Sequence, residues 1–312
     1  MNTFSVTLQA DLDYQKVILG SVSRTFALTI PLLPEALEKV VGNAYLLCRI
    51  VDTIEDAPDL SPPTKQALSQ LFLNSVTGKI TAQEFIGPCL AALKTHSNQS
   101  ELDLIEHTPA VLRILHACSP KDQEAVTQCV SIMSLGMSRF HTKQSTEGLS
   151  DLAEFEEYCY VVAGVVGELL TNLFGNHSPH FAQSIRNHES LSIGFGQALQ
   201  MTNILKDSSE DRARGVSWKP SKMSQIDLLN IAYRKLIEAR NYILLIPKQE
   251  IGIRRFCFLA FGLAALTLNT IAQKASSKKI SEPKLSRKVV WEFMALQSWR
   301  PTAIFLSNFF SI

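Results

Sequence analysis

The segment NAYLLCRIVDTIEDAP, which runs from Asn43 to Pro58, combines an apolar helical pattern with a group of carboxylates. Its apolar residues recur at the spacing of a buried helix face. Asp52, Glu55 and Asp56 stand at positions i, i+3 and i+4, so at about 100° per residue the three carboxylates share one helix face. Like charges at this spacing repel one another, and local helix stability therefore does not explain the cluster.

A second segment, QALQMTNILKDSSEDRARG, repeats this arrangement far along the chain, with carboxylates at Asp207, Glu210 and Asp211. Mg²⁺ prefers carboxylate oxygens, waters and phosphate oxygens as ligands. Two such faces would hold diphosphate groups, and the neighbouring cations Arg49 and Lys206 would stabilise a departing pyrophosphate. The alternative is that both clusters are solvated helix ends.

Helical spacing of apolar residues continues through most of the chain, whereas two-residue alternation is rare. The clearest segments are Val40–Ile54, Val126–Phe140, Phe155–Leu173 and Leu191–Leu205. Proline and glycine predict the boundaries of about ten helices. These boundaries lie at Pro31, Pro34, Pro62, Pro63, Gly87-Pro88, Pro120, Pro179, Pro220 and Pro283. We expect an all-α fold with one domain over residues 1–312.

Composition excludes several classes of function. Thirty Lys and Arg against 29 Asp and Glu give a net charge of +1, which does not favour nucleic acid as a partner. The cysteines form no CxxC pair and no cluster with histidine, so we expect buried thiols in a reducing cytosol rather than a zinc site. The sequence contains no glycine-rich motif of a Rossmann or P-loop nucleotide site.

The ends of the chain predict a cytoplasmic protein. The N-terminal residues lack the basic and apolar regions of a secretory signal. The apolar stretches Phe256–Leu268 and Ala303–Ile312 are shorter than the ~18 residues of a spanning helix, so no transmembrane anchor is expected. The tail AIFLSNFFSI is suited to peripheral contact with the inner face of a membrane.

Four blocks of the sequence stand out together. They are SRTFALTIPLLP (Ser23–Pro34), YLLCRIVDTIED (Tyr45–Asp56), YCYVVAGVVGELL (Tyr158–Leu170) and the second acidic segment (Gln197–Gly215). These blocks resemble the squalene/phytoene synthase family, and most of all its bacterial squalene synthases. They follow the family's order and cover the first two-thirds of the chain. The resemblance implies an isoprenoid-synthase helical bundle around a central apolar cavity.

The resemblance also implies roles for individual residues. Asp52 and Asp56 match the first Mg²⁺-binding motif, and Asp207 and Asp211 match the second. Glu55 and Glu210 either bind the metal as well or support its ligands. Positions that contact the diphosphate or the prenyl chain in the family correspond here to Ser23, Arg24, Thr25, Phe26, Tyr45, Arg49, Gln200, Asn203 and Lys206.

Tyr158 matches a tyrosine that the family holds near a carbocation. A phenol relays protons and its π-face stabilises a cation, whereas the plainer interpretation is a core aromatic. Ala163, Gly164 and Gly167 allow close helix packing, leave room for an isoprenoid chain, or do both. Trp218 occupies an aromatic position of the family pattern, or simply packs its loop.

The expected reaction is head-to-head condensation of two farnesyl diphosphates to presqualene diphosphate and then, with NADPH, to squalene. Mg²⁺ is the expected metal, with Mn²⁺ as an alternative. The basic stretch Lys274–Lys288 lies where family members carry a segment associated with NADPH, although a solvated linker has the same composition. The NADPH-binding residues stay unknown, and we expect a monomer or weak homodimer.

Other functions stay open at this stage. Without NADPH the product would be dehydrosqualene or, from longer substrates, phytoene. A head-to-tail prenyltransferase or a terpene cyclase also uses acidic helices, but the Tyr158–Leu170 block argues against both. A helical scaffold that binds partners through its acidic faces is the non-enzyme alternative.

Overall fold

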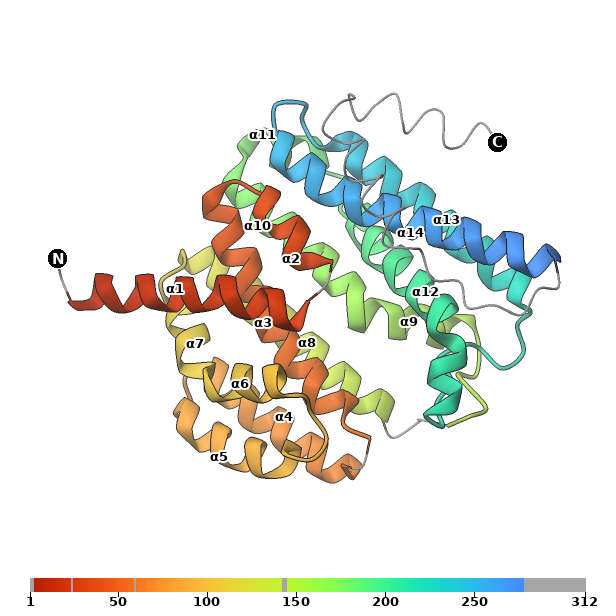
Figure 1. The fold of residues 1–312 in the computed structure, drawn as a ribbon. Coiled ribbons are helices and arrows are strands. Elements are labelled where there is room, and N and C mark those ends of the chain that lie inside the picture. The colour runs from red at the N-terminus through yellow and green to blue at the C-terminus, as the bar shows by residue number, and fades with distance from the viewer. Residues whose placement is uncertain (1–2, 24, 59, 142–144, 278–312) are drawn as a thin grey trace. The chain divides into compact units, whose positions relative to one another are not determined.

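The structure is a computed structural model that describes residues 3–23, 25–58, 60–141 and 145–277 (Figure 1). Within these ranges the regular elements are helices and no strand is present, apart from an isolated bridge between Leu149 and Pro220. The all-α fold class is therefore confirmed. Contacts divide the chain into two compact units, Met1–Lys143 with Asn172–His177, and Gln144–Thr171 with Ser178–Ile312. The single domain over residues 1–312 stays a prediction.

The first unit contains α1 to α8 and the last residues of α10. Its elements are α1 (Thr3–Val22), α2 (Phe26–Thr29), the 3₁₀ turn η1 (Ile30–Leu32), α3 (Glu35–Asp56), α4 (Pro62–Val76), α5 (Ala82–Leu93), α6 (Gln99–Glu106), α7 (Thr108–His116) and α8 (Pro120–His141). Proline in the first turn opens α4 and α8, as the sequence predicts. The boundary predicted at Gly87-Pro88 is wrong, because α5 continues through Pro88.

Helix α3 packs against α1, α7 and α8 in the first unit and carries much of its core. Leu46, Leu47, Ile50 and Ile54 are fully buried. Each such side chain contributes about 1.5–3 kcal/mol relative to an exposed position. The buried Asn43 side chain also donates from Nδ2 to the Val111 carbonyl at 2.8 Å. These contacts fix the axis of the helix whose last turns carry the first acidic cluster.

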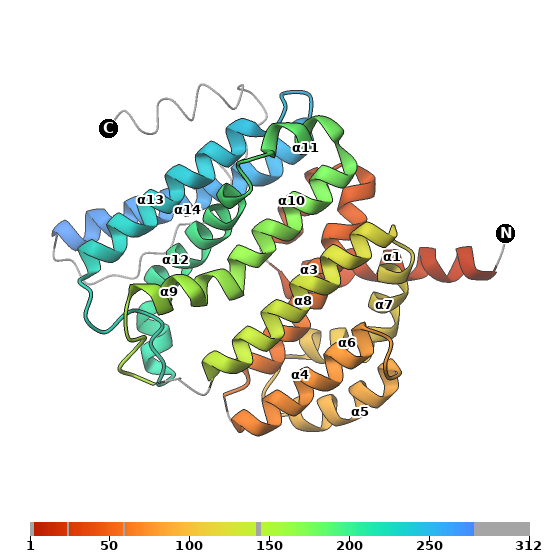
Figure 2. The same cartoon turned by 180° about the vertical axis from the view of Figure 1, so that it is seen from behind.

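The second unit contains α9 (Leu152–Cys159), the π-helical turn η2 (Tyr160–Gly164), the first residues of α10 (Val165–His177), α11 (Pro179–Ile185), α12 (Ser190–Ala213), α13 (Gln225–Leu245) and α14 (Ile251–Ser277). Helices α12, α13 and α14 pack side by side, as Figure 2 shows. The buried Tyr242 of α13 shares a hydrogen bond of 2.8 Å with Thr171 of α10.

The turn η2 interrupts the helix that the sequence predicts without a break over Phe155–Leu173. A π turn adds one residue to a helical turn and shifts the faces of the flanking helices relative to each other. Such turns occur often at functional sites, and this one begins two residues after Tyr158. The apolar periodicity around it gives no signal of the extra residue.

Small residues let η2 and α10 cross α12 at very short distance. A Cβ added to Gly167 would lie 2.0 Å from the Ser192 carbonyl oxygen, and one added to Gly196 would lie 2.0 Å from that of Ala163. Of the two interpretations of this stripe, close packing is therefore present. Room for an isoprenoid chain beside it stays a prediction.

Two helical stretches reach the length and hydropathy of a membrane span, Leu152–His177 and Ile251–Lys274. The most apolar part of the first stretch is 61% buried within the protein, and that of the second is 67% buried. A helix in the core of a protein can have the same length and hydropathy. The tail Ala303–Ile312 and most of the basic stretch Lys274–Lys288 lie outside the described residues. The six cysteines are free thiols, and all but the partly exposed Cys118 are buried, as expected.

Candidate active site

The first acidic cluster occupies the last two turns of α3, but its three carboxylates have different surroundings. Asp56 is exposed, Asp52 is partly buried, and Glu55 is fully buried with 0% of its surface exposed. Burial and the nearby charges of Asp56 and Glu55 raise the pKa of Asp52 to about 7, against the opposing effect of Arg49. Asp52 and Asp56 are thus the two carboxylates of this cluster that solvent reaches.

Glu55 is directed at α4. Its side-chain Oε1 accepts a hydrogen bond of 3.3 Å from Ser69, and its backbone carbonyl accepts one of 2.5 Å from the Lys65 ammonium. Burial lowers the pKa of Lys65, while the charges of Glu55 and Asp56 oppose this change. Of the two roles left open for Glu55, this geometry favours support of the metal ligands.

Other predicted substrate contacts gather near the first cluster. The Tyr45 hydroxyl donates to the Val22 carbonyl at 3.2 Å, and the rings of Tyr45 and Phe26 lie 5.3 Å apart. Ser23 accepts a hydrogen bond of 3.0 Å from the Phe26 backbone N–H. Thr25 is exposed beside them, and Arg24 lies outside the described residues.

Arg49 is held by a partner that the sequence did not reveal. Its guanidinium donates to Oε1 of Glu101, on α6, at 2.5 Å. Glu101 also caps α6, because its other oxygen accepts from the Asn98 backbone N–H at 3.0 Å. Burial lowers the pKa of Arg49, but attraction by Asp52 and Glu101 outweighs it and the pKa is raised. Arg49 stays charged one turn before Asp52.

The second acidic cluster lies in the last two turns of α12, in the second unit. Asp207, Glu210 and Asp211 are partly exposed. The Lys206 ammonium lies 3.2 Å from Oδ2 of Asp207 and donates to Oδ1 of Asn203 at 3.3 Å. Gln200, one turn earlier, is also partly exposed. The predicted polar positions of this helix therefore have access to a ligand.

The loop that follows this cluster reaches Tyr158. Gly215 turns the chain after α12 with φ of +80°, a conformation that suits glycine. Two backbone hydrogen bonds hold the loop: the Ser217 N–H donates to the Ser145 carbonyl at 2.9 Å, and the Leu149 N–H donates to the Lys219 carbonyl at 3.1 Å. Trp218 then stacks on Tyr158 with 4.2 Å between centroids and 7° between planes. Tyr158 is only 6% exposed.

Within the described residues, no group of three or more His, Cys, Asp or Glu side chains is arranged to hold a metal ion. Mg²⁺ does not require such a group, because it binds one or two carboxylates and completes its shell with water and phosphate. The solvent-accessible Asp52 and Asp56 fit this pattern, since a divalent cation would offset both the burial of Asp52 and its repulsion by Asp56, which raise the pKa of Asp52.

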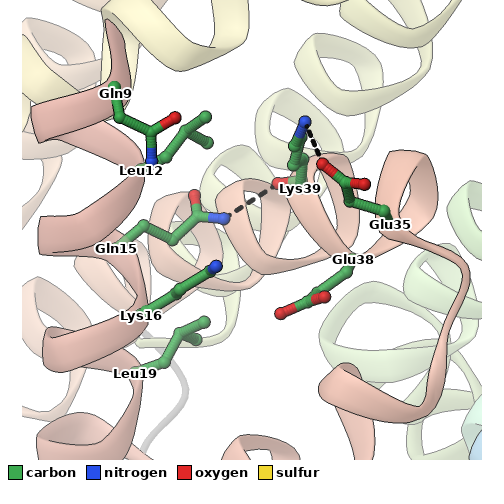
Figure 3. A pocket seen from close by; sticks show the side chains of 8 residues that line it. All are labelled: Gln9, Leu12, Gln15, Lys16, Leu19, Glu35, Glu38 and Lys39. Atoms are coloured by element: carbon green, nitrogen blue, oxygen red, sulfur yellow. Dashed lines mark hydrogen bonds and ion pairs between the residues drawn. The ribbon is translucent and has the colours of Figure 1, made fainter. Parts of the chain in front are cut away.

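A separate pocket of about 70 Å³ lies between α1 and α3 and is lined by Gln9, Leu12, Gln15, Lys16, Leu19, Glu35, Glu38 and Lys39 (Figure 3). Gln15 donates from Nε2 to the Lys39 carbonyl at 3.0 Å. From Lys39 to Asp52 the helix rises by about 20 Å. This pocket is therefore remote from the first acidic cluster and is not the active site.

Comparison with known proteins identifies the family. The family model described as squalene/phytoene synthase matches residues 19–228. The chain belongs to the squalene/phytoene synthase family. The matched region contains both acidic clusters of this family member, its Tyr158 and its Trp218.

Curated relatives of this chain are squalene synthases. The squalene synthase BSS of Botryococcus braunii is 33% identical over 197 residues, which are 62% of this chain and 39% of that protein. The squalene synthase ERG9 of Gibberella zeae is 30% identical over 207 residues, 66% of this chain and 42% of that protein. The chain thus matches about two-fifths of the length of these squalene synthases.

Solved structures of family members have the same fold. A complex of TcSQS with a ligand superposes with a TM-score of 0.80 at 20% identity, covering 96% of this chain and 90% of that one. A dehydrosqualene synthase superposes with a TM-score of 0.65 at 20% identity, covering 93% of this chain and 96% of that one. At such identities the likeness extends to the fold alone, and the helical architecture of the family is confirmed.

Two groups of predicted site residues are therefore assembled. Tyr45, Arg49, Asp52 and Asp56 belong to the first unit with Ser23 and Phe26, and Tyr158 and the second acidic cluster belong to the second unit. The predicted central apolar cavity would have to be lined by both groups, and it stays a prediction. Sequence reasoning missed Lys65 and Glu101 as partners of site residues, since neither has a motif that marks it.

Proposed function

We propose that this protein joins two farnesyl diphosphate molecules head to head, forming presqualene diphosphate and then squalene. The observation that carries the proposal is the family match over residues 19–228, which includes both acidic clusters and Tyr158. The squalene synthase names of the curated relatives support the choice of reaction class. Because the chain spans only part of their length, the substrate and product are proposals.

Asp52 and Asp56 would hold Mg²⁺ in the first cluster, and Asp207 and Asp211 in the second. Bound Mg²⁺ neutralises the diphosphate leaving group. Arg49 and Lys206, each next to a cluster, add positive charge where the diphosphate oxygens would lie. Preorganised charges of this kind stabilise a departing anion without reorganisation during the reaction.

Tyr158 would act on the allylic cation that remains after diphosphate departs. Its ring is buried and stacked on Trp218, so its π-face stays in a fixed, apolar position. Such a ring stabilises a cation, and the hydroxyl would relay the proton that leaves when the cyclopropane of presqualene diphosphate closes, passing its own proton to an oxygen of the departed pyrophosphate. The buried surroundings of Tyr158 also keep water from the cation.

Reduction of presqualene diphosphate to squalene needs hydride from NADPH. The basic stretch Lys274–Lys288 that sequence reasoning associates with NADPH lies mostly outside the described residues. Dehydrosqualene is the product of the same condensation without hydride. We assign no residue to NADPH binding. Whether the product is squalene or dehydrosqualene shows whether the enzyme uses NADPH.

The test is incubation of the purified full chain with Mg²⁺ and farnesyl diphosphate, with and without NADPH, followed by identification of the hydrocarbon. Squalene that forms only with NADPH supports the proposal, and dehydrosqualene under both conditions corrects its last step. A cyclic fifteen-carbon product, or turnover only with a homoallylic co-substrate, would overturn it. Asp207→Ala separates an enzyme from a scaffold, since only the enzyme loses turnover while its fold persists.

A further inference from the structure

Lys65 is a buried lysine whose charged end lies under the first acidic cluster. It belongs to the first turns of α4, and only 4% of its surface is exposed. Its ammonium donates to the Glu55 carbonyl oxygen, in the last turn of α3. Ser69, four residues along the same face of α4, donates to Oε1 of Glu55 at 3.3 Å. One face of α4 therefore holds both the backbone and the side chain of Glu55.

A contribution to fold stability does not explain why Lys65 and Glu55 are buried. Taking an ammonium and a carboxylate out of water costs more than well-packed apolar side chains at the same positions. At the C-terminus of α3, however, a cation meets the partial negative charge of the last carbonyls. Lys65 thus fixes the position of the turn that separates Asp52 from Asp56.

We infer that Lys65 is a positioning residue for the first metal motif, which acts through Glu55 and leaves Asp52 and Asp56 to face the metal. The inference rests on the proposed function, because it assigns roles within that metal site. Glu55 serves as an internal anchor in this arrangement, since its buried carboxylate bonds to α4. The competing view is that Glu55 is itself a metal ligand and Lys65 serves only packing.

The test uses Mn²⁺ binding to the full chain with inorganic pyrophosphate, followed by electron paramagnetic resonance without any prenyl substrate. Lys65→Met should weaken Mn²⁺ binding by roughly tenfold, the low end of the effect of residues that orient metal ligands. Lys65→Arg should recover most of the affinity, because a guanidinium also donates to the carbonyl. Lys79→Met, which removes an exposed lysine shortly after α4, is the matched control and should change nothing.

Glu55→Gln distinguishes the two views of Glu55. An amide still accepts from Ser69, so Mn²⁺ affinity should stay within roughly threefold of the wild type if Glu55 is an anchor. A larger loss in Glu55→Gln than in Lys65→Met would make Glu55 a ligand and overturn the inference. A lowered unfolding temperature in Lys65→Met with unchanged Mn²⁺ affinity would also overturn it, because Lys65 would then serve packing alone.

Two further measurements separate this inference from the proposed function. Asp52→Asn should abolish Mn²⁺ binding at the first motif, and a wild-type protein that binds no Mn²⁺ with pyrophosphate would overturn both proposals. Wild-type binding that Lys65→Met and Lys65→Arg leave intact would overturn the positioning role alone. If Lys65→Met does not fold, Ser69→Ala carries the test, with an expected loss of about tenfold that unchanged affinity would contradict.

Discussion

The indole of Trp218 lies flat on the ring of Tyr158, with 4.2 Å between the ring centroids and 7° between the ring planes. This contact joins α9 to the loop that leaves the second acidic cluster. A displacement of that loop therefore changes the position of the aromatic face beside the proposed carbocation. Trp218 would in this way connect the proposed metal binding of the second cluster with the proposed stabilisation of the cation by Tyr158.

We expect Trp218→Ala to lower both turnover and stability. Loss of a stacked pair removes about 0.5–1.5 kcal/mol beyond the buried area, and Tyr158 gains rotational freedom. If the loosened Tyr158 ring affects the carbocation step but not substrate binding, kcat should fall by roughly tenfold while the KM for farnesyl diphosphate changes little. Steady-state kinetics and thermal unfolding check this. Trp218→Phe keeps an aromatic partner and should retain most of the activity.

Tyr158→Phe separates the hydroxyl of Tyr158 from its ring. If the hydroxyl relays a proton, kcat should fall by roughly 10²-fold or more with the stack intact. Activity close to that of the wild type would assign the role to the π-face alone. Trp fluorescence reports whether the stack persists in the variant.

Much of this arrangement could be predicted from sequence, because it depends on local patterns. Apolar periodicity and the i, i+3, i+4 spacing of acids are properties of one helix, and both acidic helices formed as predicted. Pro88 shows the limit of local rules, since tertiary packing keeps α5 helical through it. The extra residue of the turn Tyr160–Gly164 also left no periodic signal.

Contacts between distant segments were beyond sequence reasoning. Glu55 shares its helix face with Asp52 and Asp56 by spacing, yet α4 covers it because Lys65 and Ser69 are presented there. Trp218 was recognised as an aromatic position, but its partner Tyr158 is sixty residues away. No motif records such pairings, since they arise from the way the helices pack.

Glu101 is expected to compete with diphosphate for Arg49. The two side chains form a partly buried ion pair, and hydrogen bonds to charged groups contribute about 1.5–3 kcal/mol. Glu101→Gln removes the charge but keeps the capping box of α6, because glutamine also serves at this position. We therefore expect inorganic pyrophosphate to bind about two- to tenfold more tightly, as measured by calorimetry with Mg²⁺.

Arg49→Gln is the companion variant and should weaken pyrophosphate binding by roughly tenfold or more. The opposite result for Glu101→Gln, weaker binding, would mean that Glu101 orients Arg49 for the ligand rather than withholding it. The Asn98 cap of α6 remains in both variants, so neither result should arise from unfolding of this helix.

Asp52 should make metal binding depend on pH near neutrality. Its pKa of about 7 lies above the ordinary value of 3.8, so between these values the folded state keeps a proton that the unfolded state has lost. The metal-free protein therefore loses stability from this group as the pH rises from about 4 to 7. A metal ligand must be deprotonated, so Mg²⁺ affinity should rise over the upper part of this range.

Calorimetry of Mg²⁺ and pyrophosphate binding at pH 6, in buffers of different ionisation enthalpy, measures the protons released. For each Mg²⁺ bound, the wild type should release more protons than Asp52→Asn, which keeps only the second cluster. Equal proton release in both proteins would show that Asp52 does not exchange its proton for the metal.

Alanine should destabilise the fold at Gly196 and stabilise it at Gly20. At Gly196 a Cβ would lie 2.0 Å from the Ala163 carbonyl oxygen, so α12 and η2 must separate. Overpacking of this kind costs about 1–3 kcal/mol, and more where backbone has to move. Nothing lies within 4 Å of a Cβ at Gly20 in α1, where alanine favours the helix by roughly 0.5–1 kcal/mol.

Urea unfolding followed by circular dichroism compares the two glycine variants. Gly196→Ala should unfold at lower urea concentration than the wild type, and Gly20→Ala at the same or a higher concentration. Because Ala163 belongs to the π turn that follows Tyr158, Gly196→Ala should also lower turnover, whereas Gly20→Ala should not. Wild-type stability in Gly196→Ala would mean that the two helices do not approach as closely as described, and that the small residues leave space between them.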